Sequence, residues 1–408
     1  MKNKLLVFSF LFLALLSSCK NGPPILPGLT KSAIIITSNP DSTLVKVNNK
    51  EPGITPFSVE DLDPGFFKLA FSKFSYLDTT IYHVIRRNAI DTVLVEMREN
   101  PSYWWKVYDE SNSPLPTIYI TKIRADEQNN IWIGTRENGL LEFKDSVFTL
   151  YNSSNSGIPD NHINDIYVVG NGTIWIATNG GFVKFDGTNW ILFNSSNLNI
   201  PSNNITTIAK DKNNILWLGT PNNGLIKFDG VDVTVYDYSN SGLPLNYITT
   251  IAIDKNNLKW IGTRGEGIAS FDGTNWKVYN SYFNGLLSSY VSKILIDKND
   301  EVWIGTGDRT MGISGGLSKF DGTAFTNYYP SENGLPGNFV YDLAFDKNEN
   351  LWIATENGLA RFDGNKWKIY NTSNSGLPSN LVTSVTVDLD QNKWVAAEAV
   401  ARYIGGKK

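Results

Sequence analysis

Short runs in which apolar and polar residues alternate fill the chain from about residue 32 to its end. The first runs, such as "AIIITSNP" and "TTIYHVIRR", lie between Ala33 and Met97. After Pro101 the runs come in sets of four, for example "ITTIAID", "LKWIGT", "GIASFDG" and "NWKVY", divided by turns rich in Asp, Asn and Gly. A period of two residues bounded by such turns predicts β-strands. The pattern therefore predicts an all-β fold.

The strands after Pro101 belong to an internal repeat. Each copy carries a Trp-[Ile/Leu/Val]-[Gly/Ala]-[Thr/Ala] step, and successive copies are 42 to 49 residues apart. Four short antiparallel strands at this period are typical of a propeller blade. We therefore predict a seven-bladed β-propeller over residues 101–408, and the steps begin at Trp132, Trp175, Trp217, Trp260, Trp303, Trp352 and Trp394.

The two ends of the repeat region complement each other. Six copies end in a fourth strand with an aromatic residue or Val followed three residues later by Tyr or Phe, and the seventh copy lacks it. The segment "WWKVYDESN" supplies such a pair, Trp105 and Tyr108, without a repeat of its own. We expect residues 104–108 to join the seventh blade, because this pairing would cover two open sheet edges.

The N-terminal residues 1–19 have the layout of a secretory signal peptide. Lys2 and Lys4 precede an apolar run that is too short for a permanent membrane helix. The run ends in Leu16-Ser17-Ser18-Cys19, which resembles the lipobox of bacterial lipoproteins. The resemblance implies that Cys19, the only cysteine, becomes an acylated N-terminus. Residues 20–31 are rich in Pro and Gly and are expected to form a flexible tether.

Residues 32–98 are expected to form a small β-domain. The order of their turns is similar to that of the PEGA family, with one departure at Asp41-Ser42-Thr43, where that family has Pro-x-Gly-Ala. The resemblance implies a β-sandwich spacer without chemistry of its own. It rests on the turns Gly53-x-Thr55-Pro56, Leu62-x-Pro64-Gly65 and Ser75-Tyr76.

The propeller repeat resembles the two-component regulator propeller family over about 300 residues. Its clearer copies include Gly376-Leu377-Pro378-Ser379-Asn380 and Gly334-Leu335-Pro336. Members often form the extracytoplasmic sensors of membrane kinases, and such propellers respond to oligosaccharides. No kinase sequence accompanies the repeats here, so the resemblance implies a binding scaffold.

Charge and reactive residues exclude several functions. The formal charge is −4 without a run of like charges, so no nucleic-acid partner is expected. The propeller has one histidine, His162, and the sequence shows no nucleophile with a second histidine and no paired carboxylates in one loop. The Asp-rich turns lack the Gly and Glu of calcium loops. We therefore expect that the protein is not an enzyme and that it binds no metal or cofactor. The enzymatic alternative is a lyase, because streptogramin B lyases are propellers with a histidine and a metal at the ring centre.

Strand direction predicts one binding face. Loops from strand four to the next strand one, and from strand two to strand three, share a face when strands alternate in direction. The first residues of the first strands include the candidate ligand-binding residues Tyr119, His162, Tyr247, Tyr290 and Phe339, with Asn204 and Leu381 in the same slot of the other blades. The alternative is that these side chains only cap the inner packing.

The loops between strands two and three add charged candidates to this face. They are Arg136, Arg264 and Glu356, joined by Asp308 and Arg309 from the longer repeat "GTGDRTMGISGGLSKF". Aromatic rings mixed with Arg and carboxylates suit glycans, and they suit a protein partner almost as well. The sequence thus predicts an extracytoplasmic outer-membrane lipoprotein whose propeller binds a glycan. The alternative is an assembly or sensor-accessory module of the cell envelope. Lys20, with no acidic cluster after it, favours the periplasmic side.

Overall fold

The computed structural model describes residues 31–98, 100–115, 119–170, 172–330 and 334–405. The chain divides into two compact units, Met1–Tyr103 and Trp104–Lys408. The expected signal peptide with Cys19, and nearly all of the expected tether, lie outside the described residues. No helix in the described part of the chain is long and apolar enough to cross a membrane.

The first unit consists of two antiparallel or mixed sheets. One sheet has the order β4-β1-β7, in which β1 and β7 run parallel, and the other has the order β3-β2-β5-β6. The strands are β1 (Ser32–Asn39), β2 (Leu44–Val47), β3 (Gly53–Ile54), β4 (Phe57–Leu62), β5 (Gly65–Ser72), β6 (Thr79–Ile85) and β7 (Ile90–Glu96).

Both sheets of the first unit contribute to one hydrophobic core. Ile34 and Ile36 of β1 are fully buried together with Leu69 and Phe71 of β5. Every second residue of β1 is buried, as expected for a strand with one face on a core. The unit is therefore a β-sandwich, and its kinship to the PEGA family stays a prediction.

The second unit contains four-stranded antiparallel sheets, or blades, in which the strands follow one another from first to fourth. The first four blades contain β9 (Ile120–Ala125), β10 (Ile131–Thr135), β11 (Leu140–Lys144) and β12 (Val147–Tyr151); β13 (Ile163–Val169), β14 (Thr173–Thr178), β15 (Gly181–Phe185) and β16 (Trp190–Phe193); β17 (Thr207–Lys210), β18 (Leu216–Gly219), β19 (Leu225–Phe228) and β20 (Val233–Tyr236); and β21 (Ile248–Ile253), β22 (Lys259–Thr263), β23 (Ile268–Phe271) and β24 (Trp276–Tyr279).

Three further blades bring the number to seven within the described residues. A four-residue helix, α2 (Pro101–Trp104), precedes the strand β8 (Trp105–Tyr108) of the last blade. The strands are β25 (Val291–Ile296), β26 (Val302–Asp308), β27 (Ile313–Phe320) and β28 (Phe325–Tyr328); β29 (Val340–Phe345), β30 (Leu351–Thr355), β31 (Gly358–Phe362) and β32 (Trp367–Tyr370); and β33 (Ser384–Val387), β34 (Lys393–Ala396) and β35 (Val400–Tyr403), followed in the sheet by β8.

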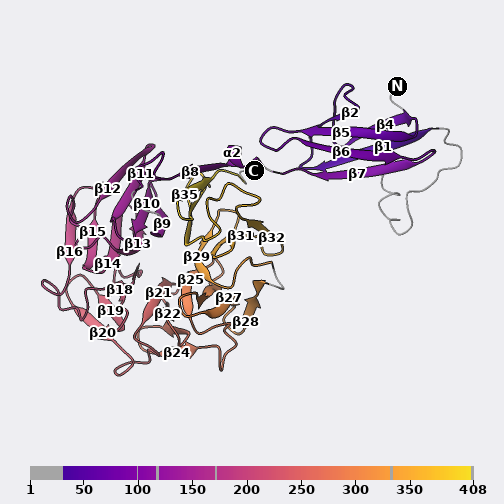
Figure 1. Cartoon of the computed structure of the whole chain (residues 1–408). Helices are drawn as coiled ribbons and strands as arrows, with labels where there is room; N and C mark the ends of the chain where they lie inside the picture. The colour runs from indigo at the N-terminus through magenta and orange to yellow at the C-terminus, as the bar shows by residue number, and fades with distance from the viewer. Residues whose placement is uncertain (1–30, 99, 116–118, 171, 331–333, 406–408) are drawn as a thin grey trace. The chain divides into compact units, whose positions relative to one another are not determined.

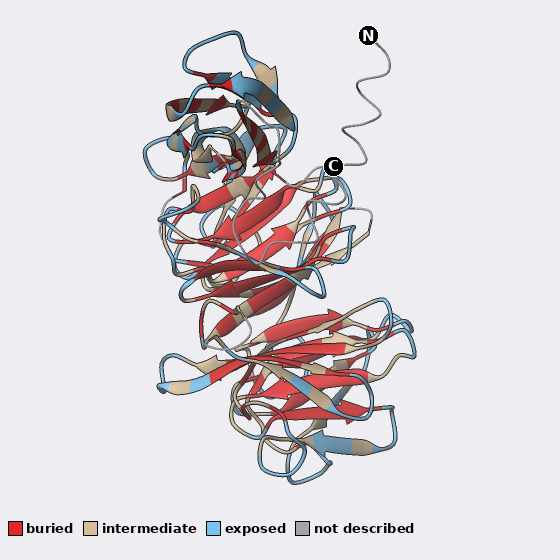
Figure 2. Ribbon diagram, turned by 90° about the vertical axis from the view of Figure 1, so that its right-hand side faces the viewer, coloured by how far each residue is buried: buried red, intermediate tan, exposed pale blue. Residues whose placement is uncertain are grey.

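The blades form a closed ring, as the repeats predict. The first strand of each blade contacts the first strand of the next, and β33 of the seventh blade contacts β9 of the first. Buried side chains gather in clusters that each join two neighbouring blades, from the first and second to the seventh and first. Figure 2 shows these buried strands in red, with exposed residues mainly in the connecting loops. The fold is a seven-bladed β-propeller.

The Trp-Ile-Gly-Thr step has a packing role at two of its positions. A side chain at Gly134 would meet Ile163 of the next blade, and Gly219 and Ile248 stand in the same relation. The step therefore keeps Gly or Ala where the neighbouring first strand approaches. The hydroxyl of Thr135 donates to the carbonyl of Gly139 and accepts the N–H of Asn138, which closes the turn after the second strand.

The N-terminal strand completes the seventh blade. β8 pairs antiparallel with β35, in register from Trp105 opposite Tyr403 to Tyr108 opposite Val400, and the two strands lie side by side in Figure 1. The Trp105 ring stacks on Tyr403 with centroids 4.8 Å apart, and Tyr108 stacks on Trp394 at 5.7 Å. This is the pairing that the strand signatures predict.

The longer repeat extends the connection between β26 and β27 as a regular hairpin. Asp308 pairs with Ile313, so its additional residues lengthen the β26–β27 hairpin rather than form an irregular loop. The hairpin ends in a tight turn in which the Asp308 carboxylate accepts the N–H groups of Thr310 and Met311. The inserted residues are thus held in a fixed conformation.

Candidate functional site

In two blades, backbone hydrogen bonds show that the slot residues and the loop residues share one face of the propeller. The N–H of Arg136 donates to the carbonyl of Tyr119 at 3.0 Å, and Arg264 donates in the same way to Tyr247 at 3.1 Å. These bonds join the start of a blade's first strand to the loop after its second strand. The aromatic slot residues and the charged loop residues therefore lie next to each other on one face, which we call the rim face.

The slot residues are separate from the core. The residue after each slot is Ile or Val and is at most 5% exposed: Ile120, Ile163, Ile205, Ile248, Val291, Val340 and Val382. In contrast, Tyr119 is 54% exposed, and His162, Tyr247, Tyr290 and Phe339 are half-buried. The core is thus filled by the following residue, which leaves ring surface of the slot residues accessible to solvent.

Four predicted residues come together between the fourth and fifth blades. The Arg264 guanidinium lies over the Tyr247 ring, 5.2 Å from its centroid, and its Nε donates to Asp308 Oδ2 at 2.7 Å. A second Arg264 nitrogen donates to Thr310 Oγ1 at 2.8 Å. Tyr290 forms a backbone bridge with Arg264. We call Tyr247, Arg264, Tyr290, Asp308 and Thr310 the Arg264 cluster.

Electrostatics fix the ionisation of the Arg264 cluster. The hydrogen bond to Asp308 raises the pKa of Arg264 above its usual range, against the effect of burial. Burial opposes ionisation of Asp308, but hydrogen bonds from Thr310 and Arg264 hold the pKa of its carboxyl below the usual value. The cluster is therefore an ion pair at neutral pH, and its guanidinium is oriented before any ligand arrives.

The sixth blade contributes two predicted residues, Glu356 and Phe339, whereas Arg309 lies on the β26–β27 hairpin of the fifth blade. The Glu356 carboxylate accepts the backbone N–H groups of Asn338 at 2.8 Å and Phe339 at 3.0 Å, so it holds the loop that carries Phe339. Arg309 is exposed and hydrogen-bonds the side chain of Tyr341. Sequence reasoning missed Tyr341. Its position is occupied by Thr, Ser or Asn in the other six blades, so the aromatic residue is a signal that a comparison of the repeats could have found.

Arg136 and His162 form a separate part of the rim face, between the first and second blades. Arg136 is exposed and His162 is half-buried. Burial and the nearby Arg136 charge lower the pKa of His162, while Asp160 and Glu137 oppose that shift. Among the residues that the structure describes, none forms a direct hydrogen bond with the His162 ring. His162 is thus mainly neutral at pH 7.

A buried charge network lies on the inner strands, where sequence reasoning placed no site. Arg124 donates to Asp342 at 2.8 Å, and Lys293 Nζ lies 3.7 Å from the same carboxylate. Burial lowers the pKa of Lys293 to about 8, and the adjacent Arg124 charge adds to this. These two cations hold the pKa of Asp342 well below its usual range despite complete burial. The network links the first, fifth and sixth blades.

Groups typical of metal centres are not found in the part of the chain that the structure describes, where no three His, Cys, Asp or Glu side chains gather. The Asp residues before the second strands act as turn caps: Asp254 Oδ1 accepts the N–H groups of Asn256 and Leu258. Asp272 caps a hairpin by accepting the N–H groups of Thr274 and Asn275. These hydrogen bonds agree with the interpretation of both Asp-containing segments, before the second strand and before the fourth strand, as turns.

Family comparison agrees with the repeat pattern. The model of the two component regulator propeller family matches residues 114–137, 157–180, 199–222, 285–308 and 334–357. The chain thus carries two component regulator propeller repeats. Four of the matched segments end in the loop after a second strand, and the segment 285–308 ends at the last residue of β26, so each includes a slot residue or its equivalent. No curated protein matches the chain.

Solved structures share the propeller fold. The extracellular domain of a hybrid two component system of B. thetaiotaomicron is 23% identical with a TM-score of 0.62, and the match covers 74% of this chain and 41% of that chain. Virginiamycin B lyase from Staphylococcus aureus is 14% identical, with a TM-score of 0.58 and coverage of 73% and 98%. YCF48 from Cyanidioschyzon merolae is 16% identical, with a TM-score of 0.53 and coverage of 74% and 98%. At these identities the likeness shows the fold alone.

Proposed function

We propose that this protein is a non-catalytic, extracytoplasmic binding module whose propeller holds a glycan at the Arg264 cluster. One observation carries the proposal. The half-buried ring of Tyr247 lies beside a guanidinium whose orientation is fixed by Asp308, and the half-buried Tyr290 forms a backbone bridge with the same Arg264. Packing alone does not require these rings, because the buried Ile248 and Val291 that follow them already fill the core.

The chemistry of the cluster suits a sugar. Aromatic faces bind the apolar C–H face of a pyranose, while oriented Arg and Asp groups exchange hydrogen bonds with its hydroxyls. Arg309 and Thr310 are exposed on the β26–β27 hairpin beside the cluster and can widen the contact. Such a site binds its ligand without a nucleophile or a general base.

The propeller neighbour from B. thetaiotaomicron supports a location outside the cytoplasm, because that protein is described as an extracellular domain. This chain covers only 41% of that neighbour. A part in signalling is therefore proposed only as an accessory role. Acylation at Cys19 and an outer-membrane location on the periplasmic side complete the proposal, and they rest on the lipobox resemblance.

A glycan array probed with the chain from Lys20 onward tests the ligand class. We expect binding to at least one oligosaccharide family. The variants Tyr247→Ala and Tyr290→Ala should each weaken it about tenfold or more, which corresponds to about 1.4 kcal/mol. Asn299→Ala and Asn348→Ala are matched controls, because both side chains are exposed in turns on the opposite face. Loss of affinity in the controls, with tyrosine variants unaffected, would place the site elsewhere.

A protein partner is the second candidate, and exposed aromatic residues favour it. Tyr238, Tyr282 and Phe283 are 68%, 78% and 85% exposed in the loops that lead from β20 to β21 and from β24 to β25, on the rim face. Exposed aromatic residues are typical of protein-binding surfaces. YCF48, a structural neighbour, has been solved bound to D1 peptide. An empty glycan array together with one envelope protein captured by the wild type, but not by Tyr282→Ser/Phe283→Ser, would select this candidate.

A further inference from the structure

The seam between the second and third blades differs from the others at one position. In six blades an Asp stands six residues before the conserved Trp, and in the second blade Val169 replaces it. Five of these Asp side chains accept the indole N–H of that Trp at 2.8 to 3.1 Å: Asp126, Asp211, Asp297, Asp346 and Asp388. The indole of Trp175 has lost this acceptor, and no bond from its Nε1 occurs among the described residues.

In two other seams, a lysine of the next blade covers the ring of the repeat Trp, and the seam beside Trp175 has no such lysine. Lys259 Nζ lies 5.1 Å from the ring centroid of Trp217 and 3.4 Å from Asp211. Lys393 covers Trp352 in the same way at 5.0 Å. The residue at the equivalent position over Trp175 is Leu216, an uncharged side chain; four other blades also have Ile, Leu or Val there. A cavity of about 390 Å³ is left beside Trp175.

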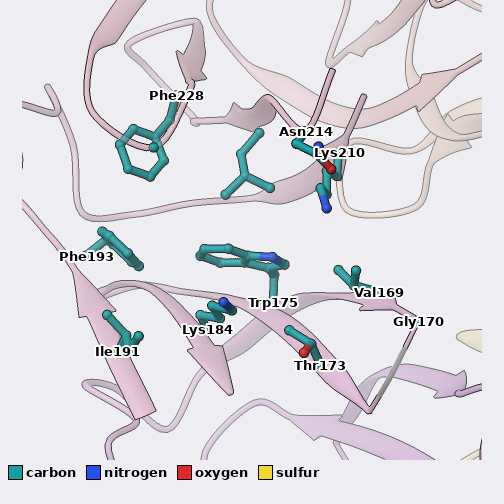
Figure 3. Close-up of a pocket in the computed structure, with 12 residues that line it drawn as sticks. Val169, Gly170, Thr173, Trp175, Lys184, Ile191, Phe193, Lys210, Asn214 and Phe228 are labelled. Atoms are coloured by element: carbon teal, nitrogen blue, oxygen red, sulfur yellow. The ribbon is translucent and has the colours of Figure 1, made fainter. Parts of the chain in front are cut away.

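The walls of this cavity are flat and apolar. Trp175 is half-buried, whereas each of the six equivalent tryptophans is at most 6% exposed. Phe193 lies 5.7 Å from Trp175 and 5.4 Å from Phe228, measured between ring centroids. Figure 3 shows the indole between the second-blade strands and the third-blade residues Lys210, Asn214 and Phe228.

The two charged side chains that line the cavity are positive, and the carboxylate of Glu127 lies close to Gly170 at its edge. Lys184 and Lys210 are the charged residues that line it, and no carboxylate does. Neither lysine has an ion pair within 4.0 Å among the described residues; Asp186, near Lys184, instead accepts hydrogen bonds in its own turn. Two ammonium groups at the edge of an aromatic cavity attract an anion that also has a flat apolar part.

We propose that this cavity binds a small aromatic carboxylate. Its ring packs against Trp175 and Phe193, and its carboxylate replaces the missing Asp by accepting the indole N–H and pairing with Lys184 or Lys210. The cavity lies at the turns between first and second strands, on the face opposite the rim face. It is therefore independent of the proposed glycan site.

Titration calorimetry of the chain from Lys20 onward with indole-3-acetate tests the proposal. We expect saturable binding that weakens with salt, and indole-3-acetamide, which has the same shape without the charge, should bind at least about tenfold more weakly. Hexanoate should also bind more weakly, because it has no ring. Equal affinity for the acid and the amide, equal affinity for hexanoate, or no saturation with indole-3-acetate up to about 10 mM would overturn the proposal.

Variants then locate the site. Val169→Asp restores the carboxylate of the other blades, so it should abolish binding of indole-3-acetate and raise the melting temperature. Val169→Thr has nearly the same shape without a charge and should bind within about threefold of the wild type. Lys184→Gln/Lys210→Gln should lose at least about tenfold in affinity while the fold is kept. Unchanged affinity in Val169→Asp or in the lysine double variant would contradict this location.

Discussion

In five blades the Asp that follows the first strand has two tasks, of which the sequence reveals one. Asp346 Oδ1 accepts the N–H groups of Asn348 and Asn350, which is the turn role that the Asp-x-x-Asn pattern predicts. Its Oδ2 accepts the indole N–H of Trp352 at 3.1 Å and the side-chain N–H of Asn350. The second task joins the turn to Trp352, a large side chain that is only 1% exposed. It depends on side-chain direction, which strand patterns do not show.

Asp346→Asn tests this second task. Burial raises the pKa of Asp346, but the bonds from Asn350 and Trp352 outweigh it and hold the pKa below its usual value. An amide offers one acceptor oxygen instead of two, so the variant should lose about 1 to 3 kcal/mol of unfolding free energy at pH 7 in urea titrations.

The pH dependence provides the control for Asp346→Asn. A depressed folded-state pKa means that the stabilisation is present above the unfolded pKa, near 4, and is lost as the pH falls through the lower folded value. The stability difference between wild type and variant should therefore shrink below pH 4. A difference that stays constant down to pH 2 would show that the carboxylate charge contributes nothing.

At the scale of the element, the Gly-Leu-Pro connection that leads into a blade packs against the fourth strand of that same blade. The Leu is buried in the core: Leu243, Leu335 and Leu377 are at most 4% exposed. The Gly lies against the fourth-strand Trp, so a side chain at Gly242 would overlap Trp276 and one at Gly376 would overlap Trp105. Trp105 thus has the same position in the seventh blade as Trp276 has in the fourth.

Gly376→Ala should destabilise the propeller by about 1 to 3 kcal/mol, because the added methyl group has no space beside Trp105. Denaturant unfolding of the variant measures the loss. The overlap is with Cβ and Cγ of Trp105, so in the double variant Gly376→Ala/Trp105→Gly the methyl group gains room and the two effects should not add. Strict additivity would mean that Trp105 does not pack on this connection.

The sequence predicts the strands and the ring better than the site. Alternation and the 42-to-49-residue period place the slot residues, because both follow from backbone geometry. The pairing of Arg264 with Asp308 and the use of Glu356 to hold the Phe339 loop join residues of different loops, and no periodic signal encodes them. The replacement of Asp by Val169 is visible in the sequence, but its meaning depends on the indole bond seen in the other blades.

At the scale of the whole molecule, anchoring is predicted to depend on one residue. If Cys19 is acylated, Cys19→Ser should prevent lipid attachment and move the protein from the detergent phase to the aqueous phase, or block its processing. Phase partitioning and metabolic labelling with a fatty acid measure this. Ser18→Ala is the matched control and should remain in the detergent phase. Unchanged partitioning of Cys19→Ser would refute the lipoprotein proposal.

Closure of the ring by β8 makes stability of the propeller depend on its first residues. Tyr108 packs with Trp394, Phe143 and Phe148, and so belongs to the cluster that joins the seventh blade to the first. Trp105 belongs to the cluster that joins the sixth and seventh blades. Removal of β8 would expose β35 as an edge and open both clusters.

A chain that begins at Ser113 should therefore aggregate or melt several degrees below one that begins at Pro101, as measured by scanning calorimetry and light scattering. The decisive test is rescue by a synthetic peptide of residues 101–112, which should bind the shortened chain and restore its melting temperature. The shortened chain still contains the β35 edge and the other residues of the two clusters that hold Trp105 and Tyr108. The same peptide with Trp105→Ala and Tyr108→Ala should not rescue it. If the chain from Ser113 melts like the longer one, or if both peptides act alike, β8 does not hold the ring closed.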